Sequence, residues 1–228
     1  MDKRWRKYFC WRARAVLLRR VGWARKSLTV ITPSYDFARR GECLLAAIAS
    51  ITAQRNHRLS LEHLIIFEGD APTAIEIETP EWYRYRIVST PDDERYDTTQ
   101  RNTGITLARG GWLAFLSDDW RWREGALQAI EQALAADVGV MLFLTRRDDN
   151  TTVSMLMDDV PQFDDISAMG IIVNRDVAGL AGFVHRFHRD YHYAADLIAM
   201  GSHYGFRWKA LPFLIAEPQA IDNRWSNE

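Results

Sequence analysis

The sequence GWLAFLSDDWRW, residues 111–122, joins an apolar run to two adjacent carboxylates, Asp118 and Asp119. Such a run is typical of a strand buried on both faces, as in a parallel sheet covered by helices. In open α/β sheets, ligands bind in the crevice beyond the carboxyl ends of the strands. The stretch therefore predicts a buried strand, and the two aspartates at its end are candidates for a binding site.

The regions around this stretch alternate between strand and helix patterns. Short runs rich in β-branched residues predict strands at 27–33, 62–69, 83–90, 111–119 and 138–145. Helical periodicity predicts helices at 42–54, 98–110 and 123–136. Residues 167–176 and 203–218 have strand character again. This alternation predicts an α/β fold with a mostly parallel central sheet and helices on both faces.

Length and composition indicate one large domain. The chain has 228 residues, 47% of them hydrophobic, which is enough for a substantial core. Cys10 and Cys43 are too few for a disulfide framework and lack metal-type Cys-x-x-Cys spacing. No apolar run approaches the roughly 20 residues of a membrane span, and the first residues lack the pattern of a signal peptide. We therefore expect a cytoplasmic protein.

Residues 1–26 differ in charge from residues 27–228, which we expect to form the globular domain. The first segment holds ten Lys or Arg against Asp2 alone, and apolar residues at helical spacing lie between the arginines. This pattern predicts a basic amphipathic helix. Such a helix suits an anionic membrane surface, and packing on the domain with a solvated basic face is an equal alternative. Nucleic acid is a weaker candidate, because no recognised nucleic-acid module follows.

Polar and acidic residues follow four predicted strands where each strand ends. They occupy positions 33–36, 68–70, 91–93 and 117–119. Taken alone, each group is typical of a turn or a helix N-cap. Together they bring carboxylates to one edge of the sheet, where their repulsion favours a bound cation or a hydrogen-bond donor. We expect Mn²⁺ or Mg²⁺ at Asp118 and Asp119, because both ions prefer oxygen ligands and bridge to phosphates.

Five segments resemble, in order and spacing, the successive motifs of family 2 glycosyltransferases, which have the GT-A fold. The segments are SLTVITPSYD (27–36), HLIIFEGDAPTA (63–74), STPDDERYD (89–97), QRNTGITLARGGWLAFLSDDW (100–120) and FHRDYHYAADLI (187–198). The resemblance covers about residues 27–218 and is closest to bacterial polysaccharide-type members. It implies a GT-A, Rossmann-like domain that binds a nucleotide-diphosphate sugar.

The resemblance also implies roles for individual residues. It assigns nucleotide binding to Pro33, Ser34, Tyr35, Glu68, Asp92, Arg101, Asn102 and Asp118. Asp118 and Asp119 would hold the metal, with Ser117 at the position where the family has the first aspartate of its Asp-x-Asp motif. Asp196 would act as the general base, and Asp190 is the alternative.

The function implied is that of an inverting, metal-dependent glycosyltransferase. It would transfer a sugar from a nucleotide-diphosphate sugar, with UDP expected, to a glycan or lipid-linked acceptor in envelope or exopolysaccharide synthesis. The basic helix would place the enzyme at the inner membrane face, and the irregular segment 145–167 would face the acceptor.

Two alternatives stay open. The first is a nucleotide-sugar-binding protein impaired in catalysis, which Ser117 favours. The second is a metal-dependent nucleotidyltransferase, although the first strand is not followed by a convincing phosphate loop.

Overall fold

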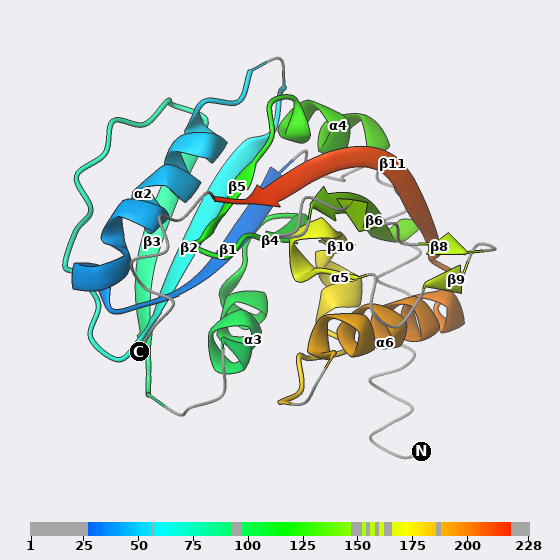
Figure 1. Cartoon of the computed structure of the whole chain (residues 1–228). Coiled ribbons are helices and arrows are strands. Elements are labelled where there is room, and N and C mark those ends of the chain that lie inside the picture. Colours follow the sequence, from blue (N-terminus) through cyan, green and yellow to red (C-terminus); the bar gives the residue numbers. More distant parts are fainter. Residues whose placement is uncertain are drawn as a thin grey trace.

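The described residues form one curled central sheet with helices on both faces (Figure 1). The computed structural model describes residues 27–55, 57–92, 97–146, 152–153, 156–157, 160–161, 166–185 and 188–219. Its strands are β1 (Ser27–Tyr35), β2 (Ser60–Glu68), β3 (Tyr83–Thr90), β4 (Trp112–Phe115), β5 (Trp120–Trp122), β6 (Val138–Arg146), β7 (Thr152–Val153), β8 (Leu156–Met157), β9 (Val160–Pro161), β10 (Ile171–Asn174) and β11 (Arg207–Pro218). Its helices are α2 (Phe37–Thr52), α3 (Thr98–Leu107), α4 (Ala126–Ala133), α5 (Arg175–Ala178), α6 (Arg189–His203) and the 3₁₀ turn η1 (Ala168–Gly170).

One half of the sheet is entirely parallel. The strand order is β3-β2-β1-β4-β10-β6-β11-β5, and β3, β2, β1 and β4 all run in the same direction. β1 and β2 pair in continuous register from Ser27 opposite Ser60 to Tyr35 opposite Glu68. The carboxyl ends of these four strands therefore meet at one edge. The polar residues that follow them lie close together for this reason.

Helices cover both faces of the sheet, as predicted. Figure 1 shows α2 and α4 on one side, and α3, α5 and α6 on the other. α2 buries Leu44, Ala47, Ile48 and Ile51, whose spacing gives the helix one apolar face. α3 approaches β1 at Gly104, where a Cβ atom would collide with the Ile31 side chain. The α/β class with a GT-A-like sheet is confirmed.

The other half of the sheet is mixed. β10 runs antiparallel to both of its neighbours, β4 and β6, whereas β11 is parallel to β6 and antiparallel to β5. β6 and β11 nevertheless run in the same direction as β1 to β4, so the sheet is mostly parallel, as predicted, and β10 and β5 run the opposite way. The sequence pattern could not show this, since a buried strand is apolar in either direction.

Two differences between the predicted and the observed elements bear on the site. α2 begins at Phe37 instead of residue 42, and Asp36 caps it with a carboxylate that accepts from the Arg39 amide at 3.3 Å. Gly41 is buried within α2 against the Phe37 ring. The strand β5 separates the acidic loop from α4. The predicted helix at 1–26 and most of the segment 145–167 lie outside the described residues.

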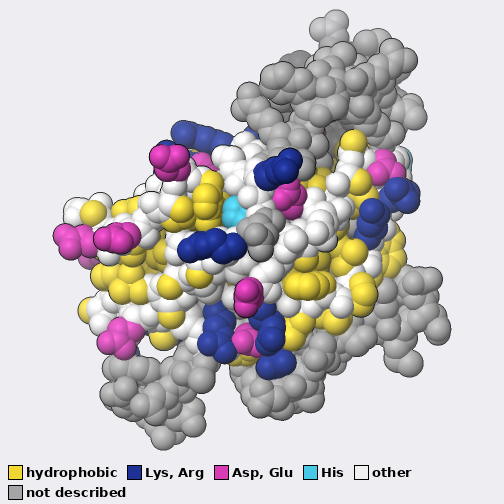
Figure 2. Space-filling view, turned by 90° about the horizontal axis from the view of Figure 1, so that it is seen from above, with side chains coloured by type: hydrophobic (Ala, Val, Ile, Leu, Met, Phe, Trp, Pro, Cys, Tyr) yellow, Lys and Arg dark blue, Asp and Glu magenta, His cyan; other side chains and the backbone are white. Residues whose placement is uncertain are grey.

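The described surface has mixed charge. On the face seen in Figure 2, basic side chains lie beside acidic ones, among hydrophobic and uncharged groups. Within the described ranges, no helix is both long and apolar enough to cross a membrane.

Candidate functional site

A cavity of about 840 Å³ opens at the carboxyl ends of β1, β2, β3 and β4. Its lining residues are Pro33, Ser34, Tyr35, Arg40, Glu68, Asp92, Asp97, Gln100, Ser117, Asp118, Asp119, His185 and Arg189. This is the crevice in which open α/β sheets bind ligands. Most of the residues predicted for nucleotide and metal binding line it: Pro33, Ser34, Tyr35, Glu68, Asp92, Asp118 and Asp119.

The end of the cavity near β2 extends into a second hollow of about 660 Å³. The two hollows share Glu68 and Asp92, and Gly69 and Pro72 are among the other residues that line the second. The buried Gln100 of α3 donates from its side-chain amide to the Glu68 carboxylate at 3.1 Å. The geometry therefore fixes a hydrogen-bond acceptor at the junction of the two hollows.

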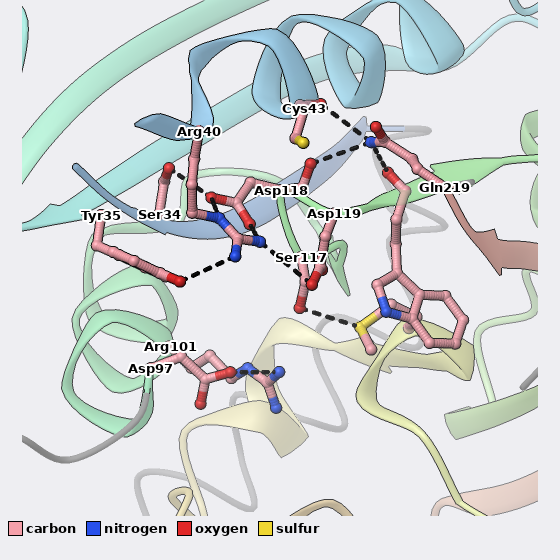
Figure 3. Close-up of polar contacts among 12 residues, drawn as sticks. Ser34, Tyr35, Arg40, Cys43, Asp97, Arg101, Ser117, Asp118, Asp119 and Gln219 are labelled. Atoms are coloured by element: carbon pink, nitrogen blue, oxygen red, sulfur yellow. Dashed lines mark hydrogen bonds and ion pairs between the residues drawn. The ribbon is translucent and has the colours of Figure 1, made fainter. Parts of the chain in front are cut away.

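The loop after β4 holds its aspartates around an arginine from α2 (Figure 3). The Arg40 guanidinium donates to both oxygens of Asp118, from Nε at 3.1 Å and from Nη2 at 2.5 Å. Nη2 also lies 3.2 Å from Asp119 Oδ2. Ser34 Oγ donates to Asp118 Oδ2 at 2.7 Å. Both oxygens of Asp118 therefore already have donors.

Burial controls the protonation of this cluster. Burial raises the pKa of Asp118, and the hydrogen bond and charge of Arg40 oppose that rise. Burial alone would lower the pKa of Arg40, but the hydrogen bond and charge of Asp118, followed by Asp119, raise it. The guanidinium stays charged, and its pairing with Asp118 is the main effect that favours the ionised form of this carboxylate.

Gln219, just after β11, holds the acidic loop in place (Figure 3). Its side-chain amide donates to the carbonyl groups of Asp118, Trp120 and Cys43, each at 3.0 Å. Its backbone N–H donates to the Asp119 carbonyl at 2.8 Å. One residue therefore ties the loop after β4 to α2, the helix that carries Arg40.

The donor set at this loop does not fit a divalent cation as it stands. Mn²⁺ and Mg²⁺ require several oxygen ligands, and Asp118 already binds Arg40 and Ser34 through both oxygens. Ser117 contributes no carboxylate, and its hydroxyl contacts the Met169 sulfur at 3.5 Å. Within the described ranges, no group of three or more His, Cys, Asp or Glu side chains is placed to hold a metal ion.

Arg101 and Asn102 do not line the cavity. Arg101 is buried and forms ion pairs with Asp97 Oδ2 and Asp190 Oδ1, both at 2.7 Å. The Asn102 side chain exchanges two hydrogen bonds with the backbone of Phe183. In this structure both residues tie α3 to the segment around α6.

The ion pairs of Arg101 extend to the cavity through Asp97, which lines it. This residue precedes α3 with a positive φ of 59°, and its Oδ1 lies 3.1 Å from Arg189 at the start of α6. Burial raises the pKa of Asp97, and the charges of Arg101 and Arg189 oppose that rise. Arg40 and Arg189 are therefore the Lys or Arg side chains that line the cavity among the described residues.

The two candidates for the general base lie on α6 outside the cavity lining. Asp196 is exposed. Asp190 binds Arg101 through one oxygen and accepts from the Ala168 amide through the other, at 2.9 Å. Both assignments stay predictions.

Sequence reasoning missed Arg40, Asp97, Gln100, Arg189 and Gln219. One signal was present for Arg40: Asp36 follows a predicted strand and is a good N-cap, which would start a helix at residue 37. Arg40 then lies one turn into that helix, above the polar loop. Gln219 has no such signal, because its partners are backbone carbonyls about 100 residues away in the chain.

Comparisons with known proteins agree with this architecture at the level of the fold. No model of a known family and no curated protein matches the sequence. Among solved structures, TarS 1-349 from S. aureus superposes with a TM-score of 0.60 at 12% identity, over 85% of this chain and 60% of that chain. Its complex with UDP-GlcNAc gives 0.61 at 11% identity, over 86% and 59%.

A second neighbour is the mannosyltransferase PcManGT from Pyrobaculum calidifontis, in complex with GDP-Man and Mn²⁺. It gives a TM-score of 0.58 at 18% identity, over 87% of this chain and 58% of that chain. This chain thus spans about three fifths of the length of these neighbours. At such identities the likeness establishes the fold alone. The chain therefore shares the fold of proteins whose structures hold UDP-GlcNAc or GDP-Man.

Proposed function

We propose that this protein is a glycosyltransferase that uses a nucleotide-diphosphate sugar, with UDP as the expected nucleotide, and transfers the sugar with inversion to a glycan or lipid-linked acceptor. One observation carries the proposal. The cavity at the carboxyl ends of β1 to β4 is lined by seven residues that the resemblance assigns to the donor site. The cavity lies in a fold shared with structures that hold nucleotide sugars.

The cavity suits the parts of such a donor. The Glu68 carboxylate accepts hydrogen bonds, as recognition of an N–H group on a nucleobase requires. Arg40 and Arg189 provide positive charge for the diphosphate. When the acceptor oxygen attacks the anomeric carbon, the bond to the diphosphate breaks and its electron pair leaves with the phosphate oxygen. These arginines would stabilise the charge that develops there.

The acceptor hydroxyl must lose its proton in this step, and we keep an aspartate of α6 as the proposed base. Asp196 is exposed, and Asp190 would have to leave Arg101 in order to accept a proton. The neighbour with bound Mn²⁺ supports cation use in this fold. Because the carboxylates of this chain contact Arg40, our proposal assigns no step to a metal.

Calorimetric titration of the full chain with UDP, GDP, UDP-GlcNAc and GDP-Man tests the donor site. We expect one nucleotide series to bind, and Glu68→Gln to weaken binding about tenfold, or about 1.4 kcal/mol. The matched control is Glu42→Gln, an exposed change on α2 outside the cavity lining. If none of the four compounds binds to the folded protein, the proposal is wrong.

A turnover assay separates an enzyme from a binding protein. Release of sugar from the bound donor supports a transferase, whereas binding without release or transfer favours the non-catalytic alternative. Asp190→Asn and Asp196→Asn identify the base, because the variant that lacks it should bind donor normally but lose turnover.

We also propose a role in envelope or exopolysaccharide synthesis at the inner membrane face. The support for it is the ten basic side chains of residues 1–26, which suit an anionic membrane surface. Co-sedimentation with anionic vesicles, with and without residues 1–26, tests it. Equal binding by both forms would refute a role for this segment.

A further inference from the structure

The Arg40 guanidinium occupies the place between two carboxylates where a divalent cation was expected. It contacts both oxygens of Asp118 and one oxygen of Asp119 (Figure 3). A planar guanidinium matches a carboxylate in this two-pronged geometry, which a lysine cannot reproduce. The Arg40 guanidinium therefore takes the place that we expected for Mn²⁺ or Mg²⁺.

A metal ion could bind Asp118 only after displacing Arg40. The Asp118 side chain is 4% exposed, and losing Arg40 would leave a nearly buried carboxylate next to Asp119. A metal at Asp118 Oδ2 would also share this oxygen with the Ser34 hydroxyl. Ser117, at the loop position where a further carboxylate was expected, contacts Met169 instead. Arg40 thus competes with a metal for the same oxygens, and few other ligands are at hand to favour the metal.

The surroundings hold Arg40 in this pose from several sides. Tyr35 Oη accepts from Nη1 at 2.9 Å, and the guanidinium carbon lies 4.8 Å from the centre of the Tyr35 ring. Gln219 fixes the backbone of the loop that carries Asp118 and Asp119. Residues from β1, α2 and the end of β11 therefore hold Arg40 and the two aspartates in this arrangement.

Arg40 also reaches the ligand space. Its side chain is 22% exposed, and it lines the large cavity. Within the described part of the chain, Tyr35 is the hydrogen-bond partner of Nη1, which carries two N–H groups. With respect to the described residues, one N–H of Nη1 is therefore left for a ligand, and an arginine paired in this way is preorganised for phosphate oxygens.

We propose that Arg40 is the resident cation of this site and contacts the diphosphate of the donor in place of a divalent metal. This inference rests on the proposed function and deepens it, because it makes donor binding independent of metal. Asp118 and Asp119 then serve to orient Arg40 and do not themselves touch the diphosphate.

The test titrates UDP and GDP into the wild-type full chain, once with EDTA and once with Mn²⁺. We expect the nucleotide that binds to have the same Kd, within twofold, in both conditions. Titration of Mn²⁺ alone should give no binding below millimolar concentration. If binding requires Mn²⁺, the inference fails and the proposed function survives; if neither nucleotide binds in either condition, both fail.

Variants sharpen the test. Arg40→Met should weaken nucleotide binding in EDTA at least tenfold, and Mn²⁺ should restore part of the loss because the carboxylates are then open to the metal. Arg40→Lys should give an intermediate loss. The control is Arg39→Ala, a neighbouring change whose side chain is 52% exposed and which should stay within twofold of wild type. Unchanged binding by Arg40→Met in EDTA would overturn the inference, and the wild-type titration decides even if this variant is unstable.

Discussion

Arg101 and Arg40 have similar partners but different surroundings. Each arginine pairs with two aspartates, and each lies about 5 Å from an aromatic ring. The Arg101 side chain is 3% exposed and joins α3 to α6, whereas the Arg40 side chain is 22% exposed and lines the cavity. The partners alone therefore do not identify a binding residue. Access to the ligand space separates the two.

The two arginines also differ in which parts of the chain their ion pairs connect. Asp97 and Asp190 belong to separate elements, so Arg101 links parts of the chain that would otherwise only pack. Arg40 joins α2 to the loop of Asp118 and Asp119, but Gln219 already ties that loop to α2, so Arg40 adds little to the architecture. We therefore expect Arg101 to matter more for stability and Arg40 more for binding.

The largest effect is expected for Arg101→Met. The change removes the buried cation that Asp97 and Asp190 share, and Asp97 keeps only its longer contact with Arg189, so we expect a cost of about 3–5 kcal/mol. Urea unfolding followed by circular dichroism measures the free energy of unfolding. A loss below about 1 kcal/mol would show that the network is not a structural link.

A smaller effect is expected for Arg40→Met, about 1–2 kcal/mol, because solvent in the cavity screens part of the charge left on Asp118 and Asp119. The same unfolding measurement applies, and Arg39→Ala should change the free energy by less than about 0.5 kcal/mol. If Arg40→Met cost as much as Arg101→Met, the distinction between a binding and a structural arginine would be refuted.

The smallest effect concerns pH. Burial raises the pKa of Asp97 above its ordinary value of 3.8, and removing Arg101 should raise it further. A carboxyl with a raised pKa binds more protons in the folded state, so its contribution to stability falls as the pH rises above 3.8. The deficit of Arg101→Met should therefore shrink by about 1 kcal/mol between pH 7 and pH 4.5.

Comparing the two proteins at each pH removes an effect that they share. Burial lowers the pKa of His63 from 6.5 to about 3, so both proteins lose stability as the pH falls below 6.5. This loss cancels in the difference between them. A deficit that stays constant with pH would show that Asp97 is not the carboxyl whose pKa rises when Arg101 is removed.

The parallel half of the sheet could be predicted because its strands are short apolar runs that end in polar residues. Tyr35, Glu68 and Asp118 lie at those ends, and all three line the cavity. The mixed half could not be predicted, since the direction of β10 leaves no mark in its composition. Arg40 was missed because the predicted helix began at residue 42, whereas α2 begins at Phe37.

Gln219 links completion of the site to completion of folding. Its amide reaches the Asp118 carbonyl across 101 positions of the chain, and β11 must be in place before this contact forms. Such long-range closures come at an entropic cost and are slow to form. The loop that carries Asp118 and Asp119 should therefore take its final shape only after β11 has paired with the sheet. The recovery of nucleotide affinity during refolding would then report when β11 has paired.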